Sequence, residues 1–540
     1  MIFGAPLLAA SVLVPLLMAV SCLSARFRAR VLSLLVFAPW PALLAAVIVK
    51  EERFAFLPPP FRLTLVMDRP GAILLGGAAL LWSAAGAYAA ATMKHDPAAP
   101  RFAVWWLMTL AGSLGLFVVG DVVTFYLLFT LASLSAYGLI IHEETEPARR
   151  AGVIYVVLAL VAEAVLLIAL VMLAAGHPDA NPQIRDVVAL LPDSPMRAGI
   201  VALFILGFAL KMGLVPLHVW LPLAHPAAPA PASAVLSGVV VKAGVIGLIR
   251  FLPFESGQAL GGGVLVAAGL LTAFYGAAIG ITQPRPKTVL AYSTVSQMGL
   301  LAVLLGVGLA TADADATLLT AYYAVHHTLV KGALFLGIGI LAAAGGARCR
   351  LVFVPMALLA LSLGGMPLTS GALAKLAVKP MLGSGLLAAA MTLAGAGSTA
   401  LMTHFLLLVA EGKPAVPPPA AQWLPWLAVA IASLIIPWSL YPAVSGETLA
   451  SLLHPAALWK TTWPLLLGIA AAFLAHRLPR LRGSVPEGDI VVLALAGVPA
   501  VLRLSEGIER ADAWLRRWPV AGLWLLGLAI LLGGIMAMRV

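Results

Sequence analysis

Lysine and histidine residues lie inside long hydrophobic segments of this sequence. A charged side chain in such a segment is costly and is retained mainly for a task. His327 and Lys331 are four residues apart in YAVHHTLVKGALFLG, so both side chains point the same way from one helix. The residues in this setting that we expect to carry protons are Lys211, His218, Lys242, His327, Lys331 and Lys375.

Proton transfer is the chemistry that these residue types allow. Apolar surroundings disfavour the ammonium form of a lysine, so a buried lysine can both take up and release a proton. Histidine titrates near neutrality without such help. A file of these groups with water between them is a proton relay. The sequence therefore predicts a relay that runs from one hydrophobic segment to the next.

Less specific explanations apply to four other basic residues. Lys379 and Arg250 lie near the ends of predicted helices, where long side chains extend toward the lipid headgroups. His326 and His404 are explained equally well as structural histidines with satisfied ring nitrogens. We therefore leave these four outside the predicted relay.

Composition places the chain among polytopic membrane proteins. Of its 540 residues, 62% are hydrophobic and 10% are charged, and the mean hydropathy is +1.05. Because one span needs about 20 apolar residues, we predict an all-α protein with about 14–16 transmembrane helices. The predicted spans are 6–23, 31–49, 71–92, 102–119, 122–141, 152–175, 198–217, 232–251, 262–281, 289–310, 318–344, 352–378, 385–410, 423–440, 462–475 and 520–538.

The first segment, 6–23, is predicted to be a retained span and not a secretory signal. No basic residue precedes it, and Arg26, Arg28 and Arg30 follow it. We expect a bacterial inner membrane, and the distribution of Lys and Arg over alternate loops favours both termini on the periplasmic side. The net charge of +11 is scattered over loops and helix ends, so we expect lipid headgroups and no nucleic acid as its partners.

Motifs for cofactors, metals and catalysis are absent from the sequence. Its two cysteines, Cys22 and Cys349, lie far apart and outside any CxxC motif, so we interpret both as packing residues. It contains no GxGxxG motif, Walker loop or nucleophile–base pair. We therefore expect no cofactor, no metal and no catalytic site in the chain itself. Whether the chain is a subunit of a proton-translocating oxidoreductase stays open.

Two prolines predict breaks in helices that carry lysines. Pro216 follows Lys211 by five residues, and Pro367 precedes Lys375 by eight. Proline removes a helical hydrogen bond and opens backbone groups toward a cavity. Two such helices, about five spans apart, predict two inverted five-helix repeats with broken helices. The predicted domains are 1–101 (N-terminal helices), 102–251 and 262–410 (the two repeats) and 420–540 (C-terminal helices).

The predicted C-terminal domain includes a charged segment, 486–518. A helical spacing places much of its charge on one face. We therefore predict an amphipathic helix that lies along the membrane. A folded-back cytoplasmic loop is the alternative.

Five motifs stand in the order of a known family: Lys211 with PLHVWLP, AHPAAPAPASAVLSGVVVKAG, LAYSTVSQMG, HHTLVKGALFLG and MPLTSGALAK. On these motifs the chain, from about 65 to 410, resembles the antiporter-like proton-translocating subunits shared by respiratory complex I, membrane-bound hydrogenases and Mrp-type cation/proton antiporters. The resemblance implies that Lys211 is the central lysine of a first half-channel and that Lys242 is the linking lysine. It implies that His327 and Lys331 form the bridge and that Lys375 ends a second half-channel. The tail after 420 resembles, in shortened form, that of the family's distal members.

One position departs from the family pattern. The family pairs its first lysine with a glutamate in the fifth span, and the matching residue here, seven before Tyr137, is Thr130. Threonine holds no charge, so the usual ion pair with Lys211 is missing. Glu163, in LVAEAVLLI of the sixth span, is the nearby carboxylate that can replace it. The alternative is that Glu163 packs against a hydroxyl or water and that the first half-channel is altered.

Three functional hypotheses follow. The first is a proton-translocating subunit of a larger complex, whose partners are other membrane subunits, lipids and protons, with Na+ left open. The second is a proton-coupled membrane subunit of an inorganic-carbon or other solute uptake complex. The third is a scaffold subunit that has lost conduction. The motifs do not separate the three.

Overall fold

The computed structural model describes residues 4–56, 63–175, 177–179, 181–343, 347–410, 420–478 and 485–492, with short stretches between 503 and 514. Residues Met1–Glu487 form one compact unit and Gly488–Val540 a second. The predicted span 520–538 and most of the charged segment 486–518 lie outside the described residues. Helices α1 to α21 all belong to the first unit.

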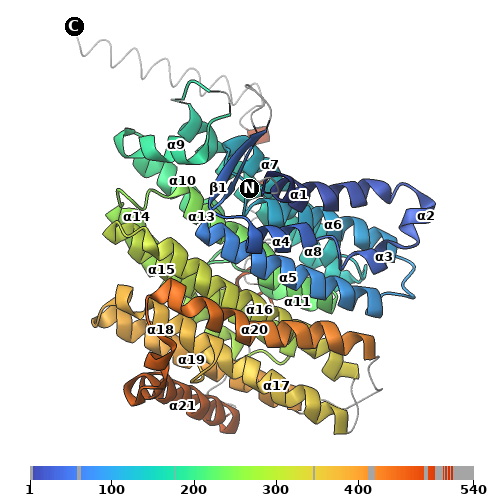
Figure 1. The fold of residues 1–540 in the computed structure, drawn as a ribbon, viewed down its shortest axis with the longest axis vertical. Helices are drawn as coiled ribbons and strands as arrows, with labels where there is room; N and C mark the ends of the chain where they lie inside the picture. Colours follow the sequence, from blue (N-terminus) through green and yellow to red (C-terminus); the bar gives the residue numbers. More distant parts are fainter. Residues whose placement is uncertain are drawn as a thin grey trace. The chain divides into compact units, whose positions relative to one another are not determined.

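Helices make up the first unit almost entirely (Figure 1). Within the described residues, 11 helices are long and apolar enough to cross a membrane, which confirms the prediction of a helical polytopic membrane protein. These are α1 (Gly4–Ser21), α5 (Arg69–Thr92), α7 (Val122–Ile140), α8 (Glu146–Ala174), the segment of α12 and α13 (Ala230–Phe251), α14 (Ala259–Gly280), α15 (Pro286–Thr311), α16 (Asp315–Ala343), α19 (Leu386–Ala410), α20 (Ala420–Ser445) and α21 (Pro455–Arg477).

Shorter helices complete the unit. They are α2 (Ala25–Arg28), α3 (Val31–Leu34), α4 (Trp40–Ile48), α6 (Ala99–Gly115), α9 (Ile184–Leu190), α10 (Arg197–Met212), α11 (Trp220–Ala227), α17 (Ala347–Gly364) and α18 (Ser370–Leu382), with 3₁₀ turns η1 (Leu191–Asp193) and η3 (Leu449–Leu453). The division of 102–410 into two inverted repeats stays a prediction.

Three predicted spans are interrupted in the structure. Segment 31–49 is split into α3 and α4, because Pro39 and Pro41 start a new helix. Segment 198–217 ends at Met212, where Gly213 closes α10 with a positive φ of 74°. Segment 352–378 is α17 and α18, separated by a turn at 365–369. The last two interruptions are the helix breaks predicted near Pro216 and Pro367.

A fourth irregularity lies inside segment 232–251, which the sequence predicts as one continuous helix. The described helix begins as α12 (Ala230–Val235), widens into the π-helix η2 (Leu236–Val240) and continues as α13 (Lys242–Phe251). The backbone N–H of Val241 donates to the carbonyl of Leu236, five residues back. Such π-turns are frequent at functional sites, and this one immediately precedes Lys242.

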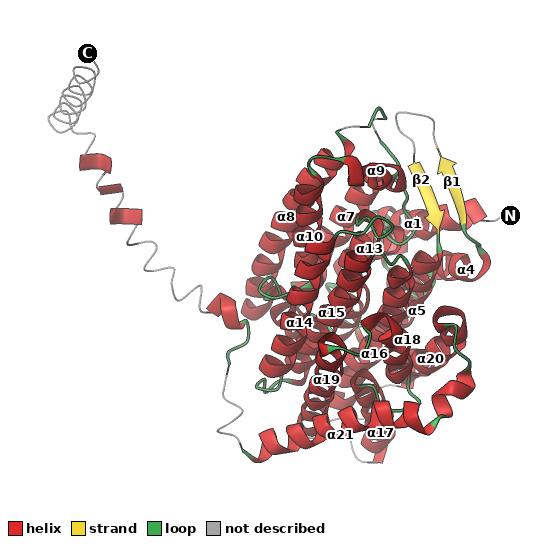
Figure 2. Cartoon of the chain, turned by 90° about the vertical axis from the view of Figure 1, so that its left-hand side faces the viewer, coloured by secondary structure: helices red, strands yellow, loops and turns green. Residues whose placement is uncertain are grey.

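A small antiparallel sheet joins α4 to α5 (Figure 2). Strands β1 (Glu52–Phe56) and β2 (Leu63–Met67) pair with Phe54 opposite Leu65. The segment after α6 extends the sheet, because Val66 N–H donates to Val118 O at 2.6 Å and Gly120 N–H donates to Thr64 O at 2.8 Å. These strands were not predicted, because each is only five residues long and β1 begins with two charged residues.

Helices α14 and α15 pack closely against each other along their length. Glycines let the two backbones approach: a Cβ at Gly269 would lie 2.6 Å from Gly299 O, and one at Gly276 would lie 2.7 Å from Ser296 N. Helix α15 is buried along almost its whole length, as is α16. This packing fixes the first turns of α15 beside the lysines of α13 and α16.

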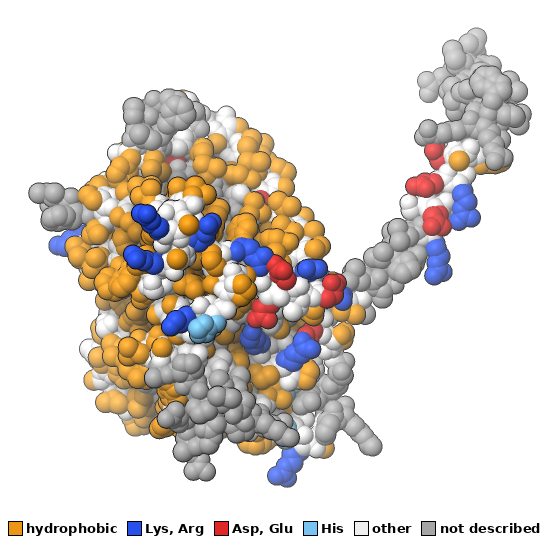
Figure 3. All heavy atoms as spheres, turned by 90° about the vertical axis from the view of Figure 1, so that its right-hand side faces the viewer, with side chains coloured by type: hydrophobic (Ala, Val, Ile, Leu, Met, Phe, Trp, Pro, Cys, Tyr) orange, Lys and Arg blue, Asp and Glu red, His pale blue; other side chains and the backbone are white. Residues whose placement is uncertain are grey.

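Polar contacts group the loops into two ends of the unit. At one end His142 bonds Asp96 at 2.8 Å, Arg101 pairs with Glu144, and Arg285 pairs with Glu487 at 3.2 Å. At the other end Arg53 donates to Gln183 at 2.9 Å, Arg250 pairs with Asp68, and Arg69 donates to Ala443 O at 3.0 Å. Figure 3 shows the side on which α2 lies in Figure 1, where Lys and Arg side chains are scattered among hydrophobic ones.

Candidate functional site

Lys211 lies in the last turn of α10, and hydroxyl groups of α7 and α8 hold its side chain. Its ammonium donates to Ser133 Oγ at 2.6 Å and to Tyr155 OH at 3.2 Å. Tyr155 OH in turn donates to the Ser133 carbonyl at 2.7 Å. The rings of Phe129 and Tyr155 each lie 5.5 Å from Nζ, so their faces also stabilise the charge. The side chain is 3% exposed.

Glu163 lies on α8 beside this lysine. The carboxylate is buried, interacts electrostatically with Lys211, and lies within reach of the hydroxyls of Thr130 and Ser133. Among the described residues, no ion pair within 4.0 Å joins Glu163 to Lys211, and Oε1 of Glu163 has no hydrogen-bond partner. The two charges therefore act on each other across the hydroxyls without direct contact.

His218 lies in the break after α10 and is fully buried. Its ring centroid is 5.0 Å from that of Tyr275 on α14 and 6.2 Å from that of Tyr292 on α15. The break therefore inserts the imidazole between these two helices.

Lys242 and His327 are in direct contact, on α13 and α16. Lys242 Nζ is 2.5 Å from His327 Nδ1 and donates to Ser237 O at 3.0 Å. Ser237 belongs to η2, so the π-helix brings this carbonyl to the ammonium. Both side chains are buried from solvent. A proton passed from Nζ to Nδ1 moves from the first predicted repeat to the second.

Lys331 lies one turn after His327 on α16 and is fully buried. It donates to Leu290 O at 2.6 Å and to Ser293 Oγ, both in the first turns of α15. Thr294 Oγ1 donates to the same carbonyl at 3.1 Å and pairs with Ser237 Oγ at 2.7 Å. Hydrogen bonds therefore link the surroundings of Lys331 to those of Lys242.

His326, which the sequence left open, connects this centre with the break before α18. Its Nδ1 is 2.9 Å from Ser370 Oγ, and Ser370 Oγ is 3.2 Å from Ser362 Oγ. Lys375 acts electrostatically on the ring, as does Lys242. His326 therefore has Lys242 and Lys375 among its charged neighbours and bonds Ser370, a serine to which the sequence assigned no role.

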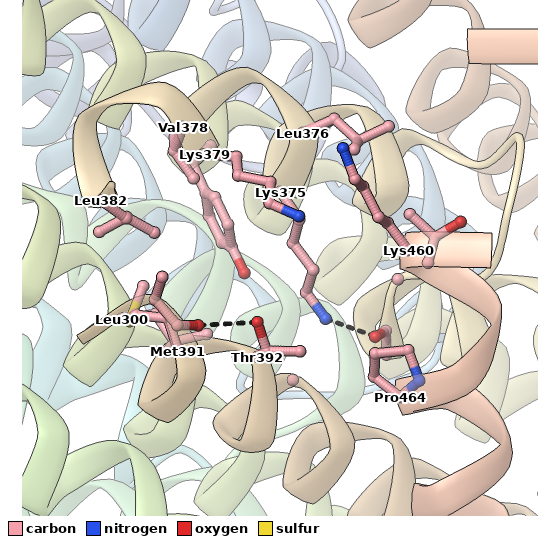
Figure 4. A pocket seen from close by; sticks show the side chains of 16 residues that line it. Leu300, Lys375, Leu376, Val378, Lys379, Leu382, Met391, Thr392, Lys460 and Pro464 are labelled. Atoms are coloured by element: carbon pink, nitrogen blue, oxygen red, sulfur yellow. Dashed lines mark hydrogen bonds between the residues drawn. The ribbon is translucent and has the colours of Figure 1, made fainter. Parts of the chain in front are cut away.

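Lys375 lies on α18 at a pocket (Figure 4). Its ammonium donates to Gly364 O, the last carbonyl of α17. The exposed lysines Lys379 and Lys460 line the same pocket. Lys460 and the neighbouring Thr461 belong to α21, so the C-terminal helix forms part of its wall.

Arg250 differs from its prediction. We expected it to extend toward lipid headgroups, but its side chain is 12% exposed and pairs with Asp68. It also donates to Phe117 O at 3.1 Å. The loop after α6 covers the end of α13. Its Phe117 carbonyl and the Asp68 carboxylate therefore hold the Arg250 guanidinium inside the protein.

The remaining predictions concern structural residues and metal ions. His404 Nε2 is 2.9 Å from Gln283 O, a contact between α19 and the turn after α14. Cys22 is a buried packing residue that donates to Met18 O, and the side chain of Cys349 lies outside the described part. Within the described ranges, no group of three or more His, Cys, Asp or Glu could hold a metal ion.

Comparison with known proteins matches residues 119–403 to the family model described as "NADH:quinone oxidoreductase/Mrp antiporter, TM". The chain is 32% identical over 364 residues to NADH-quinone oxidoreductase subunit N of Desulforudis audaxviator, covering 63% of this chain and 68% of that one. It is 32% identical over 303 residues to hydrogenase-4 component B of Escherichia coli (strain K12), covering 53% of this chain and 44% of that one. The chain thus spans less than half the length of that relative.

The fold is similar to that of a solved membrane complex. A chain of the Mrp complex from Dietzia sp. DQ12-45-1b superposes with a TM-score of 0.68 at 23% identity, over 86% of this chain and 100% of that chain. At this identity the likeness concerns the fold alone.

Proposed function

Because this chain belongs to the NADH:quinone oxidoreductase/Mrp antiporter transmembrane family, we propose that it is a proton-translocating subunit of a larger membrane complex. The contact between Lys242 Nζ and His327 Nδ1 at 2.5 Å carries this proposal. Both groups exchange protons and both are buried, so neither serves the surface. Two buried proton-exchanging groups in direct contact form one step of a relay.

We propose the following proton steps around this contact. A proton on the Lys242 ammonium passes to His327 Nδ1, and the imidazole releases a proton from Nε2 toward Lys331. The carbonyls of Ser237 and Leu290 stabilise the two ammoniums in turn. Because two nearby ammoniums repel each other, charging one lysine promotes deprotonation of the next. This repulsion moves charge along the file without a catalytic group.

Lys211 and Lys375 are the proposed ends of the file. Each lies beside a helix break, where hydroxyls or a free carbonyl hold its ammonium. His218 in the first break and His326 before the second are proposed to carry protons, through water, between these ends and the centre. Glu163 is proposed to supply the partner charge for Lys211 that Thr130 lacks.

We propose a bacterial inner membrane as the location and other membrane subunits as the partners. The relatives named above are a component of a hydrogenase and a subunit of an NADH-quinone oxidoreductase, which supports a role inside a complex. The basic loops at the Arg285 end support a cytoplasmic location for that end and a periplasmic one for both termini. Protons are the proposed cargo, and Na+ is an open second one.

A scaffold role is the competing proposal, favoured by the lack of a direct ion pair at Lys211 within the described structure. The assembled complex with Lys331→Ala, assayed for proton translocation in vesicles, separates the two. We expect the rate to fall at least about 100-fold, since the gap removes a proton-exchanging group from the file. Lys94→Ala, on an exposed loop, is the control and keeps the normal rate. Full translocation by an assembled Lys331→Ala complex would establish the scaffold role.

A further inference from the structure

His225 is a buried titratable residue that the steps above leave unused. It lies in the last turn of α11, and its side chain is fully shielded from solvent. Neither Nδ1 nor Nε2 has a hydrogen-bond partner among the residues that the structure describes. Burial of an unpaired polar group is costly. An imidazole with both nitrogens free therefore points to a role beyond packing.

The position of the ring is fixed from two sides. Its centroid is 5.1 Å from that of Phe335, which lies one turn after Lys331 on α16. Ser233 Oγ donates to the His225 carbonyl at 2.8 Å and to the Ala228 carbonyl at 3.1 Å, which clamps the turn between α11 and α12. The clamp holds the backbone and leaves both ring nitrogens available to bind water.

Three lysines from three helices act on this ring. They are Lys331 on α16, Lys287 on α15 and Lys242 on α13. Lys331 and Lys242 are the buried centre of the proposed relay, whereas Lys287 is only partly buried. Lys287 donates to Ala228 O at 2.8 Å, three residues after His225. The ring therefore has both the buried centre and the partly buried Lys287 among its charged neighbours.

The line of groups continues to the surface. Lys287 interacts electrostatically with Glu143, an exposed residue in the loop after α7. That loop also carries His142, which bonds Asp96 at 2.8 Å, and Glu144, which pairs with Arg101. From the centre outward the groups are Lys242 and Lys331, then His225, then Lys287, then Glu143. The first three groups are buried, Lys287 is partly buried and Glu143 is exposed.

We propose that His225 is a side branch of the relay, through which the Lys242 and Lys331 centre exchanges protons with the membrane face that carries Lys287 and Glu143. The inference rests on the proposed proton translocation. One ring nitrogen accepts a proton from the centre through water while the other releases one toward Lys287. The file then has an access point in its middle as well as at its ends.

The test is proton translocation by the assembled complex in vesicles in which the pH of each face is set separately. His225→Phe keeps an aromatic ring against Phe335 and removes both nitrogens, so we expect a rate at least about tenfold lower. The residual rate is expected to lose its dependence on pH at the Glu143 face. His225→Gln stays polar but cannot change its protonation, and we expect the same loss. Lys287→Gln is expected to be slower by a smaller factor.

Phe335→Leu is the matched control, because it disturbs the same ring contact without touching a titratable group. We expect it to keep the normal rate and the normal pH dependence. A translocation rate of His225→Gln within about twofold of that of the unmodified complex overturns the branch. A rate of Phe335→Leu as low as that of His225→Gln overturns it as well. If Lys331→Ala lowers the translocation rate and His225→Gln does not, only the branch is rejected. Full activity in Lys331→Ala rejects the relay itself.

Discussion

Neutral oxygen atoms hold three lysines of the proposed relay. Lys211 contacts two hydroxyls, Lys331 a carbonyl and a hydroxyl, and Lys375 a carbonyl. Such partners accept hydrogen bonds from an ammonium but do not fix its charge as a carboxylate would. A lysine held this way changes its protonation with less cost than one in a tight ion pair. The chemistry of the site is therefore set largely by neighbours that carry no charge.

Glu163→Gln tests whether Lys211 needs a charge at longer range. We expect translocation to fall nearly as much as in Lys211→Ala, about 10-fold to 100-fold, because the carboxylate acts on the same ammonium. The double variant is expected to lose little more than either single one, since residues that act as a unit are not additive. The measurement is the proton translocation rate of the assembled complex, with its yield as the folding control.

An unaffected Glu163→Gln beside an inactive Lys211→Ala would contradict this role. It would mean that burial and hydroxyls alone set the behaviour of Lys211. Thr130→Glu then becomes the informative variant, because it restores the family's carboxylate one turn from Ser133. A changed pH dependence of translocation in that variant would identify the usual ion pair.

Irregular helix geometry recurs beside the lysines. Lys211 precedes the break at Gly213, Lys242 follows the π-helix, and Lys375 follows the break at Gly365. At the last two places the irregular backbone brings a carbonyl to the ammonium. Lys331 lies in a regular helix and instead takes its carbonyl from α15. The helices thus offer the ammonium groups backbone carbonyls as hydrogen-bond acceptors, where ion pairs of soluble proteins offer carboxylates.

The lysines could be predicted from the sequence, but most of their partners could not. A charge in an apolar span is conspicuous, so Lys211, Lys242 and Lys331 stand out. Ser133 and Tyr155 do not, because hydroxyls are common in spans and their role depends on which helices pack together. The π-helix before Lys242 left no signal either, since its residues suit an ordinary helix. The fold class followed from composition, whereas the contacts required the packed structure.

The α14–α15 pair can be tested by filling its closest approach. Gly269→Val places side-chain atoms against Gly299 O, so we expect the helices to separate and the free energy of unfolding to fall by about 1–3 kcal/mol. Gly263 lies on the same helix, and a Cβ added there would meet no atom within 4 Å, so Gly263→Val is the control and should change stability little. Thermal unfolding in detergent measures both. Equal stability of the two variants would contradict the packing argument.

Both ends of the first unit carry basic residues with carboxylate partners and basic residues without them. Arg250 at the sheet end is neutralised by Asp68 in a largely buried pair. At the other end Arg26 and Arg28 on α2 are exposed, and the described structure pairs neither with a carboxylate. Arg53 and Arg69 at the sheet end are exposed as well and bond an amide oxygen and a backbone carbonyl, so the proposed orientation rests on the distribution of Lys and Arg over the loops. The proposed branch through His225 then opens toward the cytoplasm.

Labelling of single cysteines determines the orientation of the whole molecule. Cys22 and Cys349 are first replaced by serine, and Glu447→Cys or Lys94→Cys is added at an exposed site at each end. We expect a membrane-impermeant thiol reagent to label Glu447→Cys in intact cells and Lys94→Cys only in inverted vesicles, because a charged reagent does not cross the hydrocarbon layer. Labelling of both after detergent permeabilisation is the control for reactivity. The reverse pattern would place the Lys94 end in the periplasm, and the His225 branch would then exchange protons with that compartment.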